Sequence, residues 1–114
     1  MRRGRLPRRP RRTGLIMSFI QSIEFATEQR SELHELMTRW TSDAIGAGTA
    51  QRSTLAEDRS NPGRFVLAVA FESAESAAQN SERPETGAFA AEFSALCSEG
   101  PTFREFDIVT VFGD

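Results

Sequence analysis

Seven apolar residues follow one another from Phe65 to Phe71, between the charged Arg64 and Glu72. Successive side chains of a strand point to opposite faces, so this run is apolar on both of its faces. A strand of that kind belongs in the middle of a sheet that is covered on both sides. The stretch therefore predicts a central strand, and the other elements are placed by asking what covers its two faces.

Three further segments show the alternation that is typical of strands, at residues 18–27, 49–58 and 103–112. The segment 49–58 carries charged side chains on both faces, which favours a sheet edge. A turn signal, Ser60-Asn61-Pro62-Gly63, leads from it into the central strand, so we expect these two strands to form a hairpin.

Three helices are predicted between the strands. Thr27 is the expected N-cap of the first, which runs to about Ile45, and Ser73 is the expected N-cap of a short helix over 74–81. Pro84 suits the first position of the third helix, and Gly100-Pro101 is expected to end it. Apolar residues at helical spacing mark the buried stripe of the first helix: Leu33, Leu36, Met37, Trp40 and Ala44.

The element order predicts an α+β, ferredoxin-like βαββααβ fold, with a four-stranded antiparallel sheet and helices on one face only. The face without helices would then be apolar and open to water, which favours aggregation. We therefore expect a second copy to pack its sheet on this face in a two-fold homodimer. The residues expected on this face are Ile20, Ala26, Val66, Ala68, Ala70, Val109 and Val111.

Charge is distributed unevenly along the 114 residues, a length that fits one domain. Seven of the fourteen arginines lie in the first twelve residues, whereas residues 13–114 carry the other seven and all sixteen acids, a net charge of −9. Residues 1–16 are expected to be a disordered tail, or an extension upstream of a natural start at Met17, before one domain over 17–114. A nucleic-acid-binding arm is a competing interpretation, but no aromatic or helical reader follows it.

Several classes of protein are excluded by what the sequence lacks. No apolar run approaches the ~20 residues of a membrane-spanning helix. Cys97 is the only cysteine, which excludes an intrachain disulfide and fits a reducing, cytoplasmic setting. With one cysteine and one histidine, a structural zinc site within the chain is excluded. There is no phosphate-binding glycine loop and no nucleophile elbow, so no cofactor is expected.

Several short motifs in the second half of the chain are familiar. They are Asn80-Ser81-Glu82-Arg83-Pro84-Glu85-Thr86, Phe89-Ala90, Leu96-Cys97, Pro101-Thr102-Phe103 and Asp107-Ile108-Val109. With them, residues 18–112 resemble the antibiotic biosynthesis monooxygenase-like proteins of the dimeric α/β-barrel superfamily, in particular small actinobacterial members of unassigned role. The resemblance implies ferredoxin-like subunits whose sheets form a barrel in a dimer, with a ligand pocket between sheet and helices.

Members of that superfamily differ in activity. Some oxidise polyketide aromatics with molecular oxygen and no metal or flavin, some degrade haem, some are isomerases, and many have no known activity. The haem-degrading branch pairs an asparagine on the first strand with a tryptophan near the hairpin and a histidine on a later helix. Here the first strand carries Ser22 and Glu24, and the only tryptophan and histidine share the first helix, so haem degradation is not expected.

Three residues are candidates for chemistry. His34 is the only histidine and could act as a general base, although packing at the helix edge is the competing interpretation. Trp40 could wall an aromatic pocket or simply pack in the core. Asn80, with Glu82 and Arg83, could form a polar mouth or only a helix cap and a local ion pair. The phenylalanines expected to line the pocket are Phe25, Phe65, Phe71, Phe89 and Phe93.

Two functional hypotheses follow. The first is a cofactor-independent oxygenase that acts on a small hydrophobic aromatic in a phenylalanine-lined pocket, as the resemblance implies. The second is a non-catalytic module that binds a small ligand or serves dimeric interaction, because the predicted cavity is poor in ionisable groups. An open pocket with His34 or Asn80 directed inward would favour the first, and a cavity closed by phenylalanine would favour the second.

Overall fold

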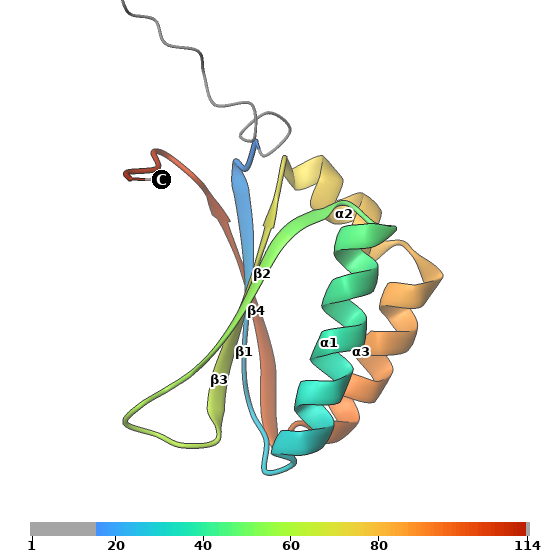
Figure 1. Ribbon diagram of the computed structural model, residues 1–114, viewed down its shortest axis with the longest axis vertical. Helices are drawn as coiled ribbons and strands as arrows, with labels where there is room; N and C mark the ends of the chain where they lie inside the picture. Colours follow the sequence, from blue (N-terminus) through green and yellow to red (C-terminus); the bar gives the residue numbers. More distant parts are fainter. Residues whose placement is uncertain (1–15, 114) are drawn as a thin grey trace, which may run out of the picture.

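The computed structural model describes residues 16–113, so the predicted tail lies outside the described residues apart from Ile16. The described part of the chain runs in the order βαββααβ (Figure 1). Its elements are β1 Phe19–Ala26, α1 Arg30–Gly46, β2 Ala50–Glu57, β3 Arg64–Phe71, α2 Ala74–Ser81, α3 Pro84–Leu96 and β4 Glu99–Asp107.

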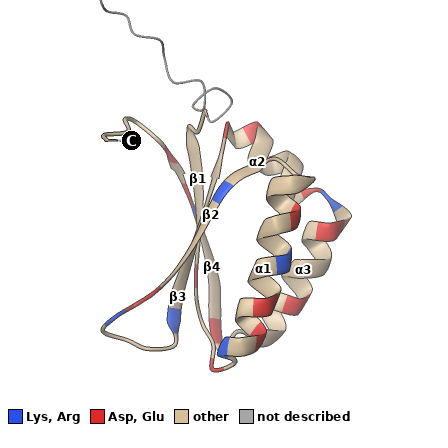
Figure 2. Cartoon of the chain, viewed as in Figure 1, with Lys and Arg blue, Asp and Glu red and all other residues tan. Residues whose placement is uncertain are grey.

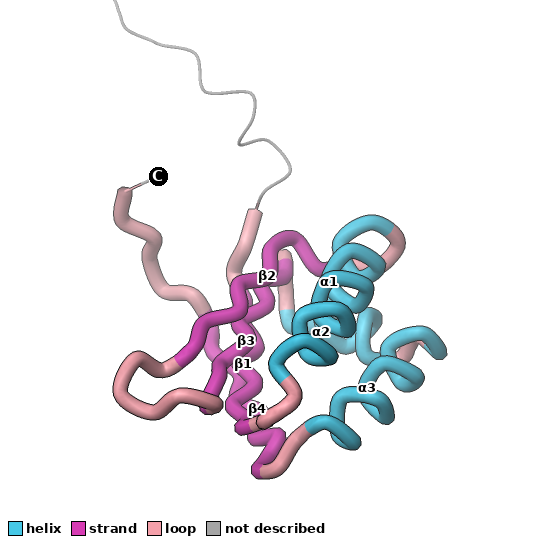
Figure 3. Tube along the Cα trace, turned by 60° about the horizontal axis from the view of Figure 1, so that its bottom comes forward, coloured by secondary structure: helices cyan, strands magenta, loops and turns pink. Residues whose placement is uncertain are grey.

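The four strands form one antiparallel sheet in the order β2-β3-β1-β4, which confirms the predicted α+β, ferredoxin-like fold. The apolar strand β3 is central, next to β1, and the polar strand β2 is at an edge, as predicted. Ile23 of β1 lies opposite Leu67 of β3 and Phe103 of β4. All three helices lie on one face of the sheet, which we call the helix side, and the other face is the open side (Figures 1 and 3).

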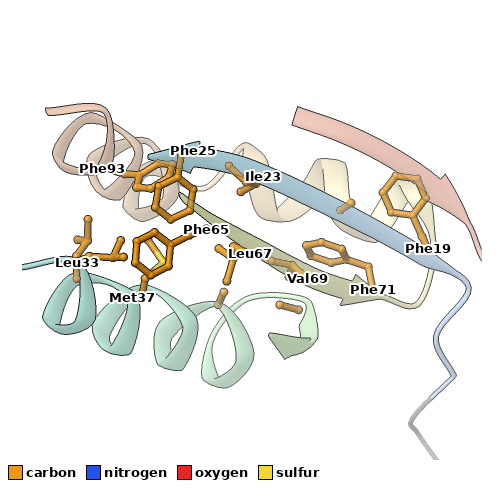
Figure 4. Packing of buried hydrophobic residues seen from close by; sticks show 14 residues of the cluster. Phe19, Ile23, Phe25, Leu33, Met37, Phe65, Leu67, Val69, Phe71 and Phe93 are labelled. Atoms are coloured by element: carbon orange, nitrogen blue, oxygen red, sulfur yellow. The ribbon is translucent and has the colours of Figure 1, made fainter. Parts of the chain in front are cut away.

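The core lies between the sheet and the helices. Phe25, Phe65 and Phe93 meet near one end of this layer, where Leu33 and Met37 of α1 point toward them (Figure 4). The predicted stripe of α1 is buried except for Trp40, which is half-buried. Helical spacing of apolar side chains therefore places the face of α1 correctly.

Two of the predicted helix starts are confirmed. The hydroxyl of Ser73 accepts a hydrogen bond from the backbone nitrogen of Ser76 at 3.0 Å and caps α2. Pro84 occupies the first turn of α3, where its missing N–H is not needed. No helix within residues 16–113 combines the length and apolar character that crossing a membrane requires.

The predicted N-cap role of Thr27 is wrong, because α1 begins three residues later and no side chain caps it. The buried Thr27 hydroxyl instead donates to the carbonyl of Leu96 at 2.6 Å and accepts from the backbone nitrogen of Gln29 at 3.0 Å. Thr27 therefore fastens the end of α3 to the end of β1.

The predicted last strand, 103–112, begins and ends too late. Gly100 was expected to end α3, but α3 ends at Leu96 and Gly100 lies within β4. Its φ is +82°, and a Cβ there would lie 2.7 Å from the carbonyl oxygen of Glu24. Gly100 thus allows β4 to approach the backbone of β1 at the place where the pairing register shifts.

This earlier strand changes the open side. Val109 and Val111, predicted to lie on that face of the strand, come after the end of β4, and Val109 is 92% exposed. The residue that β4 does present there is Phe106, which lies opposite Ile20 and is 46% exposed. Half-buried apolar side chains of β3, Val66 among them, continue this apolar surface.

Acidic residues are spread along α1 and α3 (Figure 2). Arg39 of α1 pairs with Glu92 of α3 at 3.3 Å, and Arg30 of α1 pairs with Glu57 of β2 through two contacts of 2.5 and 2.8 Å. The second pair closes one end of the core, because the Arg30 guanidinium also lies 5.6 Å from the ring centre of Phe65.

Candidate functional site

A cavity of about 320 Å³ lies on the helix side of the sheet. Its floor is formed by side chains of all four strands, and its roof by side chains of all three helices. The floor residues include Gln21, Ile23, Ser53, Leu67, Val69, Phe71, Pro101 and Phe103. The roof residues include Trp40, Thr41, Ala44, Asn80, Thr86, Gly87, Ala90 and Phe93.

The cavity exists because α3 packs mainly against α1 and not against the sheet. Trp40 of α1 stacks on Phe89 of α3 at 6.2 Å between ring centres and contacts Phe93 at 5.6 Å. These aromatic contacts join the two helices above the sheet. Small residues below them, Ala90 and Gly87, leave space between α3 and the strands, and a Cβ added to Gly87 would meet nothing within 4 Å.

Of the five phenylalanines expected in the pocket, Phe71 and Phe93 line the cavity. Phe25 and Phe65 stack on one another at 5.5 Å beyond it, and Phe25 meets Phe93 edge-on at 4.7 Å. The ring of Phe89 does not line the cavity. It contacts Trp40 and the guanidinium of Arg39 instead. Phe25 and Phe65 therefore fill one end of the layer, whereas Phe71 and Phe93 border the cavity.

The three candidates for chemistry are separated by the fold. Trp40 and Asn80 both line the cavity. His34 is exposed on α1 and is not among the lining residues, and its carbonyl accepts a hydrogen bond from Thr38 at 2.8 Å. The catalytic role of His34 stays a prediction that gains no support from this placement.

Asn80 is held firmly in the cavity wall. Its side-chain oxygen accepts from the backbone nitrogen of Thr49 at 3.4 Å, and its carbonyl accepts from the Thr86 hydroxyl at 2.6 Å. Gly48 leaves room for this arrangement, because a Cβ there would lie 2.2 Å from the Asn80 side-chain oxygen. The contacts join the end of α1 to the junction of α2 and α3.

Arg83 strengthens the same junction. Its guanidinium lies 2.9 Å from a carboxylate oxygen of Asp43 on α1, and both side chains are half-buried. The hydrogen bond to Asp43 raises the pKa of Arg83 above its ordinary value. Glu82, grouped with these residues from the sequence, is exposed and has no part in the cavity wall. The expected local ion pair is the contact of Arg83 with Glu85 at 3.6 Å, whereas the pair with Asp43 is distant in sequence and was not predicted. Of Asn80, Glu82 and Arg83, only Asn80 lines the cavity.

Among the described residues, no ionisable side chain lines the cavity. Cys97, at the end of α3, is half-buried, and burial raises the pKa of its thiol, so it stays a neutral, small apolar group. Within residues 16–113, no three His, Cys, Asp or Glu side chains are grouped so that they could hold a metal ion.

Two polar lining residues, Gln21 and Ser53, were not singled out from the sequence. Gln21 interrupts the apolar face of β1 that contains Ile23 and Phe25, and this interruption was the available signal. Ser53 lies on β2, where alternation is too polar to show which face meets the helices. Such polar residues on the helix side of a sheet mark where the core gives way to a cavity.

No known protein family and no curated protein matches the sequence. Solved structures do match the fold. A candidate antibiotic biosynthesis monooxygenase from Nitrosomonas europaea has a TM-score of 0.74 at 15% identity, covering 86% of this chain and 95% of its own. SnoaB, a cofactor-independent oxygenase from Streptomyces nogalater, has a TM-score of 0.72 at 13% identity, covering 85% of this chain and 99% of its own.

A conserved protein from Methanosarcina mazei Go1 is equally similar in shape, with a TM-score of 0.74 at 8% identity over 82% of this chain and 94% of that one. At these identities the likeness concerns the fold. The chain therefore shares its fold with the candidate antibiotic biosynthesis monooxygenase and with SnoaB.

Proposed function

We propose that the helix-side cavity binds a small hydrophobic aromatic molecule and that this molecule is oxygenated there without a cofactor. The observation that carries the proposal is the cavity itself, about 320 Å³ in volume and lined mainly by apolar and aromatic side chains with a few polar groups. The fold it shares with the cofactor-independent oxygenase SnoaB supports the oxygenation step.

Each half of the wall has a role in this proposal. Trp40 offers a flat aromatic surface on which an aromatic ligand stacks. Asn80 is fixed through its side-chain oxygen, so its amide nitrogen remains available to a ligand oxygen.

The chemistry that we propose suits a wall in which none of the described lining residues is ionisable. A suitable substrate provides its own acidic position, as an anthrone or a quinol does. In an anthrone, a CH₂ group becomes a carbonyl while O₂ supplies that oxygen atom and its second atom leaves as water. The four electrons lost by the substrate equal the four taken up by O₂, so no further reductant is required.

Oxygen uptake with anthrone and with a naphthalene quinol tests the proposal. We expect turnover by the wild type and its loss in Trp40→Ala, provided that circular dichroism shows the variant folded. His34→Ala is the matched control on the same helix and should keep its activity, because His34 lies outside the cavity. Loss in His34→Ala with retention in Trp40→Ala would contradict the assignment of the site.

A non-catalytic ligand-binding protein is the second candidate, and the absence of ionisable lining side chains favours it. The two candidates differ in one result. Saturable binding of the aromatic with no oxygen uptake would support the binding protein and contradict the oxygenase.

We also propose that a second copy of the chain covers the open side. Val66, Ala68 and Ala70 present an apolar strip there, and Ser22 has a buried hydroxyl without a partner among the described residues. After β4, the exposed residues Val109 and Phe112 add further apolar surface. The strip matches the requirement of a two-fold interface in which the same surface meets itself.

Light scattering after size exclusion measures this directly. We expect a dimer at micromolar concentration and its dissociation in Ala68→Glu, which places a charge in the middle of the strip. Ser42→Glu, on the exposed outer face of α1, should stay dimeric. A folded wild-type monomer at micromolar concentration would contradict the proposal.

A further inference from the structure

Two polar side chains of the cavity, Ser53 and Gln21, make no hydrogen bond that holds the fold together. The Ser53 hydroxyl is buried and has no partner among the described residues. The Gln21 side chain likewise makes no hydrogen bond within residues 16–113. Buried polar groups in folded proteins are nearly always paired, so an unpaired one in a cavity wall requires an explanation.

The two threonine hydroxyls of the wall, by contrast, are already engaged. The Thr41 hydroxyl donates to the carbonyl of Met37 at 2.7 Å, and the Thr86 hydroxyl donates to the carbonyl of Asn80 at 2.6 Å. These bonds are local and belong to the helices. Ser53 and Gln21 differ from them because their hydrogen-bonding groups are free for a molecule in the cavity.

The sheet places these two residues on either side of one apolar side chain. Ser53 of β2 and Gln21 of β1 both lie opposite Val69 of the central strand β3. Neighbouring strands are about 4.8 Å apart, so the backbones of Ser53 and Gln21 are about 10 Å apart. An aromatic ring lying over Val69 would have a hydrogen-bonding group at each of two edges.

We propose that Ser53 and Gln21 are specificity-determining residues that hydrogen-bond oxygen substituents of the aromatic ligand. The ligand class is then a hydroxyl- or carbonyl-bearing aromatic, and a hydrocarbon of the same size is rejected. A serine hydroxyl and a glutamine amide each donate and accept, so the pair suits both a phenol and a ketone. Such a site rejects an analogue without the oxygen, because the groups of the wall would stay unpaired. This inference rests on the proposed binding of an aromatic in the cavity.

Calorimetric titration of the full chain with 1-naphthol and with naphthalene tests the inference. We expect the wild type to prefer 1-naphthol. Ser53→Ala should lower the affinity for 1-naphthol about tenfold, the loss of about one neutral hydrogen bond, and keep or raise the affinity for naphthalene, because one unpaired group of the wall is gone. Gln21→Met, which keeps the length of the side chain, should act in the same direction on the naphthalene quinol, which carries a second oxygen for the other edge.

Thr41→Val is the matched control. It removes a hydroxyl from the same cavity wall, but one already bonded to Met37, so the preference between the two probes should not change. Thermal unfolding provides a second readout. Because the Ser53 hydroxyl has no partner in the fold, Ser53→Ala should keep or raise the Tm.

The outcomes separate this inference from the proposed function. Equal wild-type affinity for the two probes, or an unchanged preference in Ser53→Ala, would overturn the inference while leaving aromatic binding intact. A lowered Tm in Ser53→Ala without a change in preference would show a structural role and overturn it as well. Binding of neither probe would contradict the proposed function itself, and this inference with it.

Discussion

Both ends of the layer lie between the same sheet and the same helices, but side chains fill one end and the other end contains a cavity. At the packed end, around Phe25, Phe65 and Leu33, aromatic and aliphatic side chains interlock (Figure 4). At the hollow end, around Ser53 and Asn80, the same sheet and helices enclose a cavity. One end stabilises the fold, and the other end leaves room for a ligand.

Side-chain size and polarity explain the difference. The packed end is built from large apolar residues, whereas small or polar residues such as Gln21, Ala44 and Gly87 line the cavity at the hollow end. Polar interactions hold the helices in place at both ends. At the packed end, the Thr27 hydroxyl donates a hydrogen bond to the carbonyl of Leu96, and at the hollow end Arg83 forms an ion pair with Asp43. The cavity can therefore remain open without the helices collapsing onto the sheet.

The largest expected effect is at the packed end. Phe25 is 1% exposed and contacts two other aromatic rings, so Phe25→Ala should lower the free energy of unfolding by about 3–5 kcal/mol. Phe103→Ala is the matched change at the hollow end, where the ring is 53% exposed and lines the cavity, and its cost should stay below about 1 kcal/mol. Urea unfolding of both variants measures the contrast, and equal losses would remove it.

The next largest effect concerns the hydrogen bond between Thr27 and Leu96 at the packed end. Thr27→Val keeps the shape of the side chain but removes its hydrogen bond to Leu96, so the free energy of unfolding should fall by about 1–3 kcal/mol. Thr38→Val is the control, because that hydroxyl bonds the carbonyl of His34 on an exposed helix face. If the two variants lose the same stability, Thr27 does not fasten α3 to β1.

Two glycines of the hollow end should respond in opposite directions. Gly87→Ala fills open space on a helix and should raise the free energy of unfolding by about 0.5–1 kcal/mol. Gly48→Ala should lower it, because the added carbon would collide with the side chain of Asn80. Chemical denaturation of the two variants provides the test, and a loss of stability in Gly87→Ala would show that the cavity wall is closed there.

The smallest effect concerns the ion pair beside Phe65. The hydrogen bonds from Arg30 and from the backbone of Gly63 lower the pKa of Glu57 from its ordinary 4.5 to about 2. The pair therefore stabilises the fold above pH 4.5, and this contribution is lost as the pH falls toward 2. Glu57→Gln should be less stable than the wild type at neutral pH. The difference in their free energies of unfolding should shrink as the pH falls through that range.

Urea midpoints from neutral pH downward measure that deficit. Glu92→Gln removes a single 3.3 Å contact with Arg39 and should change the midpoint at neutral pH less than Glu57→Gln does. If the difference in urea midpoint between the wild type and Glu57→Gln stays constant down to the lowest pH, the Arg30–Glu57 pair does not stabilise the fold in this way.

Local patterns predicted most of the fold. The apolar run at 65–71, the stripe of α1, the cap at Ser73 and the proline in the first turn of α3 each reflect a preference that acts within a few residues. The errors came from contacts that are distant in sequence. Position 100 requires glycine because β4 approaches the backbone of β1 closely there. In the sequence, a glycine followed by a proline resembles the signal that ends a helix. Thr27 uses its hydroxyl on the far end of α3 and not on its own helix.

The candidate site could be predicted only in part, for a related reason. The aromatic content indicated an apolar cavity. Of the residues expected in or near it, four line the cavity: Trp40, Asn80, Phe71 and Phe93. Which phenylalanines fill the core and which face the cavity depends on how far α3 stands from the sheet, and no local pattern encodes that distance. The position of Ser53 depends on the pairing of β2 with β3, which is also a distant contact.

The most direct test of the central claim is an amide chemical-shift titration of the folded protein with 1-naphthol. If the hollow end is the ligand site, saturable shifts should concentrate at Ser53, Val69, Asn80 and Gly87, while the amides of Leu33 and Phe65 at the packed end stay unchanged. Saturable shifts confined to the open side of the sheet, or no saturable shifts at all, would contradict it.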